Sequence, residues 1–400
     1  MWWLTKDRLE NIEMIRMAIR EINKKYDSKY WVNKDERREY PLEYVKELES
    51  LGFMGINIPK EYGGAGYGLA EADIILEELA YSAGGTEASS SIHAVYFNNH
   101  ILVKYGKEEV KQKYLPEIAK GNLRFQVFAV TEPQAGFNTT RISTIAKKEG
   151  DYYIISGQKI FISRVKYSDL GILAARTTPL EKVEKRTQGI SLFLVDFREA
   201  KKYIKTVEIP NNVRRAVDTN ILYIENLPIP KENLLGEEGK GLYYLLEEAD
   251  IERLLIAGQS VASGKYVIKR AVEYAKSRIV FPPDPIGKYQ GIQFPLADAW
   301  IRLEAADLMK WRGIELAEKN EDRKLLGQYA NMAKYLAAEA CDLACRYAIQ
   351  TFGGYGFSID LDIERHWRAA TLTTFAQVSP HMILNFVAQH VLGLPRSYGG

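Results

Sequence analysis

The chain has 400 residues, of which 46% are hydrophobic, and its 54 Lys and Arg against 52 Asp and Glu leave a formal net charge of +2. This length is enough for a substantial core in roughly two or three domains. So balanced a charge does not indicate a nucleic-acid-binding surface or a polybasic membrane-binding face. The apolar start MWWL is too short for a signal peptide, and no stretch approaches the roughly 18 apolar residues of a membrane helix, so we expect a cytoplasmic protein.

The first third of the chain has the pattern of amphipathic helices. From about residue 6 to 120, segments such as LENIEMIRMAIREINKKY and ADIILEELAYSAG repeat apolar residues at helical spacing, with helix breakers between them. We therefore expect an N-terminal α-helical domain over residues 1–123.

The pattern changes to β-strands in the middle of the chain. From about residue 124 to 235, short β-prone runs such as RFQVFAVTE and ISLFLVDF are separated by Gly, Pro and Asn. We expect about seven or eight strands, which form a β-barrel or sandwich domain over residues 124–238.

Helical periodicity resumes at Gly241 and runs to about Ala348, with a break near VFPPDPIGKY, and short helices follow to about Leu392. This pattern predicts a C-terminal helical bundle domain over residues 239–400. The two cysteines, Cys341 and Cys345, lie in an Ala-rich part of it, where we expect reduced core residues. This pair and five scattered histidines do not predict a metal site.

The order of these regions indicates the fold class. Helices, then strands, then helices predict an α+β multi-domain protein rather than an alternating βαβ fold. The chain also lacks a GxGxxG motif after a strand and a GxxxxGK motif. The sequence therefore lacks the phosphate-binding motifs that usually indicate nicotinamide binding or nucleotide-triphosphatase activity.

Several motifs follow one another along the chain in a specific order and spacing. They are GFMGINIPKEYGGAGYG (52–68), FAVTEPQAGFN (128–138), GQKIFIS (157–163), LPIPKENLLGEEGKG (227–241), DIERLLIAG (250–258), QGIQFPLAD (290–298) and QTFGGYGFSIDLDIERHWRAA (350–370). Together they resemble the acyl-CoA dehydrogenase family over essentially the entire chain. The resemblance implies the fold of that family, with an N-terminal α-helical domain, a central β-barrel or sandwich and a C-terminal four-helix bundle. It also implies an FAD cofactor, an acyl-CoA substrate, an electron-transfer flavoprotein as acceptor and a homotetramer.

The resemblance also implies which residues hold FAD. Thr131 would offer its hydroxyl to the flavin ring, Phe161 would replace the family's usual Trp beside the ring, and Ser163 would replace its Thr at N5. Arg278 and the turn QTFGG would reach the pyrophosphate and adenosine bound by a neighbouring subunit. The full set of expected cofactor-binding residues is Phe128, Val130, Thr131, Gly136, Phe161, Ile162, Ser163, Arg278, Phe281, Gln290, Gln350, Gly353, Gly354, Ser379 and His381.

The implied reaction is α,β-desaturation of an acyl thioester, in which a carboxylate removes the α-proton while a hydride moves to flavin N5. Where most of the family has a loop glutamate, this chain has Gln377, whose amide cannot accept that proton. The isovaleryl-CoA and long-chain branches place their glutamate on a bundle helix instead, in a segment that Asp250, Glu252 and Arg253 match. Glu252 is therefore the expected base, and the backbone N–H of Gln377 the expected donor to the thioester carbonyl.

The expected substrate-binding residues are Asp250 and Arg253, with Arg253 at the CoA portion, and Phe137. Phe137 and Asn138 replace the Ser and Asp of the family's turn near the pyrophosphate or pantetheine. The segment EEADIER that holds Glu252 has a simpler interpretation as a solvated cluster of charges.

Three functions remain open at this level. The first is a competent acyl-CoA dehydrogenase, which Glu252 and Arg253 favour. The second is a related enzyme that acts on a different carbon acid or uses oxygen, and the third is a non-catalytic FAD-binding subunit of a heteromeric dehydrogenase. Gln377, Phe137 and Asn138 favour the second and the third.

Overall fold

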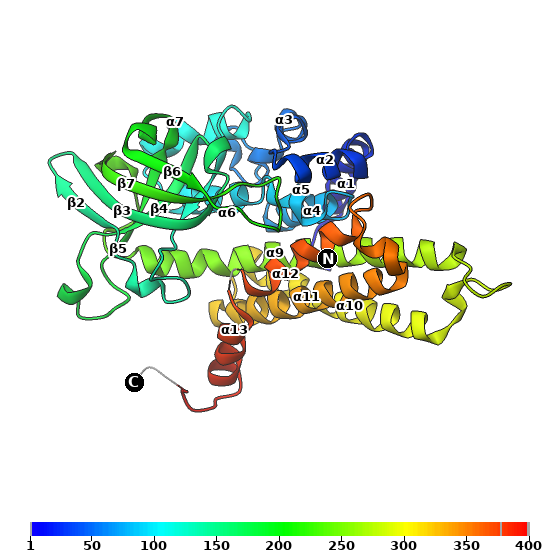
Figure 1. Cartoon of the computed structure of the whole chain (residues 1–400). Helices are drawn as coiled ribbons and strands as arrows, with labels where there is room; N and C mark the ends of the chain where they lie inside the picture. The colour runs from blue at the N-terminus through cyan, green and yellow to red at the C-terminus, as the bar shows by residue number, and fades with distance from the viewer. Residues whose placement is uncertain (1, 377, 398–400) are drawn as a thin grey trace.

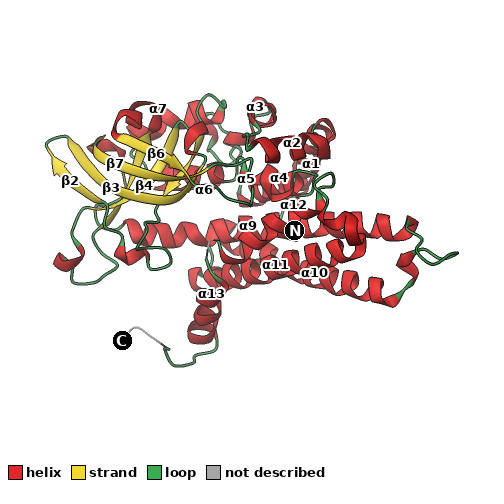
Figure 2. Cartoon of the chain, in the orientation of Figure 1, coloured by secondary structure: helices red, strands yellow, loops and turns green. Residues whose placement is uncertain are grey.

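The computed structural model describes residues 2–376 and 378–397. It has the predicted order of helical region, β-sheet and helical bundle (Figures 1 and 2). The N-terminal region contains α1 (Lys6–Lys25), α2 (Ser28–Arg37), α3 (Leu42–Ser50), α4 (Leu69–Ala80), α5 (Gly85–Ser90), α6 (Ala94–Tyr105) and α7 (Glu108–Ala119). In α1 the buried residues recur every third or fourth position, as Ile12, Ile15, Ile19 and Ile22, so one face of the helix packs on the core.

The middle region is one mixed sheet. Its strands are β1 (Phe125–Ala129), β2 (Ile145–Glu149), β3 (Tyr152–Ser163), β4 (Leu170–Arg176), β5 (Ile190–Asp196), β6 (Ile204–Glu208), β7 (Thr219–Pro230) and β8 (Leu234–Leu235), with the short helix α8 (Phe197–Ala200) after β5. The strand order is β6-β7-β3-β2-β4-β5-β8, and β1 pairs in parallel with β4. The pairing of β3 with β7 shifts register between Lys159 and Ile162, which marks a β-bulge.

Long helices form the C-terminal region. They are α9 (Gly241–Ser277), α10 (Gln290–Glu318) and α11 (Arg323–Phe352), followed by α12 (Ile363–Phe375) and α13 (Pro380–Phe386). Cys341 and Cys345 are fully buried and free on α11, as predicted. No helix in the described part of the chain is long and apolar enough to cross a membrane.

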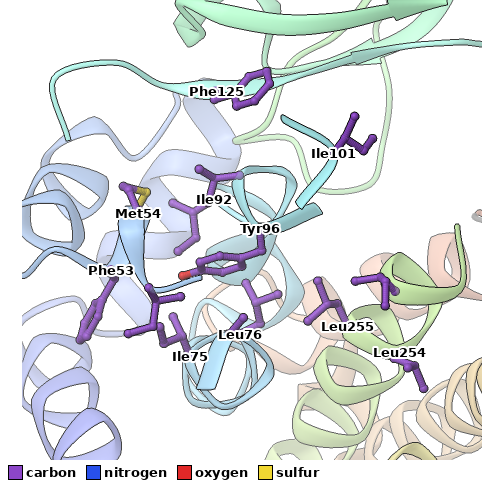
Figure 3. Close-up of a cluster of buried hydrophobic side chains, with 14 of the residues drawn as sticks. Phe53, Met54, Ile75, Leu76, Ile92, Tyr96, Ile101, Phe125, Leu254 and Leu255 are labelled. Carbon is purple, nitrogen blue, oxygen red and sulfur yellow. The ribbon is translucent and has the colours of Figure 1, made fainter. Parts of the chain in front are cut away.

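One hydrophobic core joins the three regions. Figure 3 shows Leu76 of α4, Phe125 of β1 and Leu254 of α9 in the same cluster, and all three side chains are completely buried. Because the first half of α9 packs on both the N-terminal helices and the sheet, charged residues on that part of the helix are withdrawn from solvent.

Candidate active site

The charged segment EEADIER lies on the first half of α9 and is largely buried. Glu248, Asp250 and Glu252 are 2%, 9% and 4% exposed. Glu248 lies 2.5 Å from His100 Nδ1, and Asp250 accepts a hydrogen bond of 2.8 Å from Arg253. The interpretation of this segment as a solvated charge cluster is therefore wrong, because the tertiary packing of α9 covers it.

Glu252 differs from its two acidic neighbours because its carboxylate has no hydrogen-bond partner among the residues that the structure describes. Across residues 2–376 and 378–397, no hydrogen-bond donor lies within reach of this group, and the nearest basic atom is Nε2 of His93, 3.8 Å from Oε1. Burial, with Arg164 and Arg214 nearby, holds the pKa of His93 well below its usual value. His93 is therefore neutral near pH 7, and Glu252 has no charged ion-pair partner in the described part of the chain.

The pKa of Glu252 is raised to about 8. Burial is the largest cause and the negative charge of Glu248 adds to it, whereas Arg164, Arg253 and Arg214 act in the opposite direction. A carboxylate with a pKa near neutrality is a much stronger proton acceptor than a solvated one. Glu252 thus has the environment that a general base requires.

Aromatic rings connect Glu252 to the end of β1. His93 lies beside Phe97 of α6, with ring centroids 5.5 Å apart, and Phe97 meets Phe128 of β1 edge to face at 5.2 Å. The structure therefore brings the predicted base close to the predicted flavin-binding segment that follows Phe128.

That segment is tied to β3 beside the bulge. Thr131 accepts a backbone hydrogen bond from Ile160, and its hydroxyl donates to the carbonyl of Ile160 at 2.5 Å. Next to it, the completely buried pair of Lys159 and Glu132 joins the same two segments at 2.9 Å, and Lys159 also donates to the carbonyl of Val130. These contacts hold Val130 and Thr131 against the bulge of β3.

Phe161 lies in the bulge in a strained conformation. Its φ is +60° and its side chain is 65% exposed, although a bulky residue rarely adopts a positive φ. Such strain costs on the order of 1–3 kcal/mol and concentrates at functional sites. Its neighbour Ile162 is buried, and the Ser163 hydroxyl is 3.4 Å from that of Thr219. The strand thus presents an aromatic face beside a hydroxyl.

A second set of predicted cofactor residues lies at the opposite end of α9. Arg278 follows the last turn of this helix, and Phe352 stacks on Tyr274 at 4.4 Å, which brings Gly353 to the same end. The helical rise of about 1.5 Å per residue places Arg278 about 39 Å from Glu252 along the axis, and Figure 1 shows this end of α9 far from the sheet.

The members of this distal set share exposure to solvent. Gly353 has φ +60°, and open space surrounds it and Gly354, which permits close approach of a ligand to the backbone. The exposed residues of the set are Arg278, Phe281, Gln290, Gln350, Gly353 and Gly354. A single chain therefore does not bring the two sets together.

The remaining predicted residues lie apart from both sets or outside the described chain. Ser379 is buried and caps α13 by accepting a hydrogen bond from the backbone of Met382, and His381 is exposed on the first turn of that helix. Gly136 and Phe137 lie on an exposed turn. Gln377 lies outside the described residues, so its predicted role stays a prediction.

Sequence reasoning missed three residues around Glu252: His93, Arg164 and Arg214. His93 and Arg164 are buried, and Arg214 is half-buried. A signal existed only for Arg164, which directly follows the predicted motif residue Ser163. Nothing in the local sequence indicates that the three side chains lie near one base.

Comparisons with known proteins agree along the whole chain. Family models for the N-terminal, middle and C-terminal domains of acyl-CoA dehydrogenases match residues 10–122, 127–226 and 239–392. The acyl-CoA dehydrogenase FadE12 of Mycobacterium tuberculosis is 34% identical over 392 residues, which cover 97% of this chain and 98% of that protein. The CarC subunit of the caffeyl-CoA reductase-Etf complex of Acetobacterium woodii is 32% identical and covers 91% and 94%.

Solved structures show the same similarity. Butyryl-CoA dehydrogenase from Megasphaera elsdenii has a TM-score of 0.88 at 27% identity and covers 97% of this chain and 99% of that chain. A chain from work on the electron transferring flavoprotein of Acidaminococcus fermentans has a TM-score of 0.89 at 29% identity, with coverage of 97% and 98%. The prolyl acyl carrier protein oxidase AnaB has a TM-score of 0.88 at 26% identity, with coverage of 96% and 99%.

Proposed function

The chain belongs to the acyl-CoA dehydrogenase family of oxidoreductases, and on that premise we propose that it desaturates an acyl-CoA thioester between the α- and β-carbons with Glu252 as the base. The observation that carries this proposal is the buried carboxylate of Glu252, which has no ion-pair or hydrogen-bond partner among the described residues and lies close to the segment expected to bind the flavin. Gln377 leaves the loop position without a carboxylate, so the helix position has to supply the base.

The residues present fit FAD, the cofactor that the family implies. Phe161 exposes a flat aromatic face in a strained bulge, Ser163 supplies a hydroxyl beside it, and Thr131 keeps free lone pairs after donating its proton to Ile160. At the distal set, Gly353 and Gly354 leave room for phosphate groups, and Arg278 supplies a positive charge. When bound, FAD would supply the hydride acceptor.

Glu252 performs the proton chemistry in this proposal. One of its carboxylate oxygens takes the α-proton of the thioester, and the raised pKa makes this transfer less unfavourable than it would be for a solvated carboxylate. Burial excludes water that would otherwise hydrate the carboxylate. Arg253, whose Nε is buried without a partner among the described residues, is the expected contact for the CoA portion.

The rate should depend on pH through Glu252. The base acts only in its ionised form, and its pKa of about 8 leaves most of the free protein protonated at pH 7. We expect kcat/KM for flavin reduction to rise about tenfold per pH unit at low pH and to level off above about pH 8. Anaerobic stopped-flow measurements between about pH 6 and 9 would check this, and a profile that falls with rising pH would contradict it.

The predicted cofactor residues near β1 and β3 lie far from the distal set around Arg278, so one chain does not bring both sets to a single FAD molecule. We propose that the distal set of one subunit completes the FAD site of its neighbour in a homotetramer. Exposed Phe294, Ile301 and Leu308 recur every seven residues along α10 at 61%, 67% and 61% exposure. Such a stripe on one helix face is typical of a surface that packs against another helix.

We expect the protein to sediment as an oligomer, and the double variant Ile301→Asp/Leu308→Asp to dissociate and to lose FAD, because charged residues in an apolar interface are not tolerated. Analytical ultracentrifugation with the ratio of FAD to protein would measure both effects. Met17→Asp, at a similarly exposed apolar residue of α1, is the matched control. A monomer that retains FAD tightly would contradict the proposed assembly.

The electron acceptor is proposed to be an electron-transfer flavoprotein. The similarity to CarC, a subunit of an Etf complex by name, and to the chain from Acidaminococcus fermentans supports this choice. The similarity to the oxidase AnaB favours oxygen as the second candidate, and oxygen consumption during turnover separates the two.

Anaerobic mixing of the FAD-loaded protein with a panel of acyl-CoA esters tests the proposed function. We expect at least one ester to bleach the yellow absorbance within the time of catalytic turnover. Absence of bleaching with every ester would refute the proposed activity and would favour the non-catalytic subunit.

A further inference from the structure

Two arginines lie between Glu252 and the end of β3. Arg164 directly follows Ser163, adopts φ +63°, and is only 6% exposed. Its Nη1 donates to the backbone carbonyl of Ser90 at 2.8 Å and is 3.3 Å from the Ser90 hydroxyl, and its Nε donates to the carbonyl of Gln126. Arg214, at φ +48°, donates from Nη1 to the same Ser90 hydroxyl at 2.9 Å. We call Arg164 and Arg214 the arginine pair.

The arginine pair has no anionic partner in residues 2–376 and 378–397, where no carboxylate oxygen lies within 4.0 Å of either guanidinium. The buried cations Lys159 and Lys310, in contrast, each contact carboxylates at 2.8–2.9 Å. Arg214 uses one of its five N–H donors on the described protein. Two desolvated like charges that share one hydroxyl are costly unless an anion joins them.

The pKa values of both arginines are lowered, as expected for buried cations without an anionic partner among the described residues. Burial lowers the pKa of Arg214 to about 10, and the charge of Arg164 adds to the effect. Burial likewise lowers the pKa of Arg164. Glu252 does not serve as the missing anion, because it lies beyond ion-pair distance of both arginines and its own pKa is raised rather than lowered.

The position of the arginine pair relates it to the substrate. Arg164 Nη1 is 3.5 Å from Nδ1 of His93, whose Nε2 is 3.8 Å from Glu252. On the other side, Arg164 adjoins Ser163, which under the proposed function faces the flavin. An acyl group held between the base and the flavin therefore extends beside the arginine pair.

We propose that the arginine pair binds a carboxylate on the acyl group, so that the preferred substrate is the CoA thioester of a dicarboxylic acid. This inference rests on the proposed function and specifies its substrate class. A guanidinium matches the two oxygens of a carboxylate with parallel N–H donors, and the unused donors of Arg214 are available for that contact.

The test compares dicarboxylic acyl-CoA esters of increasing length, each matched with the monocarboxylic ester of equal chain length. Anaerobic flavin reduction is measured in the complete FAD-loaded protein. We expect the best dicarboxylic ester to exceed its match in kcat/KM by about 10- to 100-fold, as for a hydrogen bond to a charged group. Arg214→Met should remove that advantage by slowing only the dicarboxylic ester, whereas Arg186→Met, at an exposed arginine of the same region, should leave it unchanged.

The outcomes separate the two proposals. If the monocarboxylic esters react equally fast or faster in the unmodified protein, the inference is overturned and the proposed function is left intact. The same conclusion follows if FAD-replete Arg214→Met loses kcat/KM equally for both classes of ester. Absence of reaction with every ester would refute the proposed function together with the inference. Because the comparison of esters uses the unmodified protein, it stays decisive even where Arg214→Met fails to fold.

Discussion

Glu252→Gln is expected to slow flavin reduction by acyl-CoA about 10³-fold, within the range that a positioned general base contributes. The amide keeps the shape of the side chain but cannot accept the α-proton. Glu248, one helical turn earlier, cannot take over, because its carboxylate is held by His100 at 2.5 Å. The effect would be measured by anaerobic stopped-flow mixing with the ester that reacts fastest with the unmodified protein.

Glu247→Gln is the matched control for this experiment. It makes the same substitution on the same helix, at a carboxylate that pairs with Lys104 and Arg323 near the surface. We expect this variant to keep its rate to within a few-fold. An FAD-replete Glu252→Gln protein with an unchanged rate would show that another group is the base.

Lys159→Met is expected to destabilise the protein by about 3–5 kcal/mol, because it leaves the buried charge of Glu132 without its partner. The two side chains are 0% and 1% exposed. Since this pair ties the segment of Val130 and Thr131 to the bulge with Phe161, we also expect weaker FAD binding. Denaturant unfolding and the retained FAD content would measure the two effects.

The double variant Lys159→Met/Glu132→Gln separates loss of charge balance from loss of packing. Ser143 and Thr144 donate backbone hydrogen bonds to separate carboxylate oxygens of Glu132, and the single amide oxygen of a glutamine could still accept one of these two bonds. We expect the double variant to recover part of the lost stability, because neither buried charge remains, while one backbone N–H loses its acceptor. A double variant as unstable as Lys159→Met would assign the effect to packing instead.

The sequence predicts candidate site segments wherever a motif lies within one continuous stretch, and their role in binding flavin stays a prediction. FAVTEPQAGFN and GQKIFIS each indicated a flavin-binding segment from neighbouring residues, and the structure places Thr131 and Ile160 in direct hydrogen-bonded contact. The state of Glu252 was not predictable, because EEADIER is equally compatible with a solvated helix face. Its burial depends on helices and strands that are distant in the sequence.

The sequence by itself determined the fold class and the order of helical region, sheet and bundle, because helical and strand periodicities are local properties of the chain. It also determined the family resemblance, whereas the choice of Glu252 over Gln377 as the base stays a prediction. Only the tertiary structure decided that Glu252 is buried without a charged partner among the described residues, that Arg164 and Arg214 meet at Ser90, and that Arg278 lies far from Glu252. The physical reason is that burial, charge proximity and separation arise between segments distant along the chain, which no local pattern records.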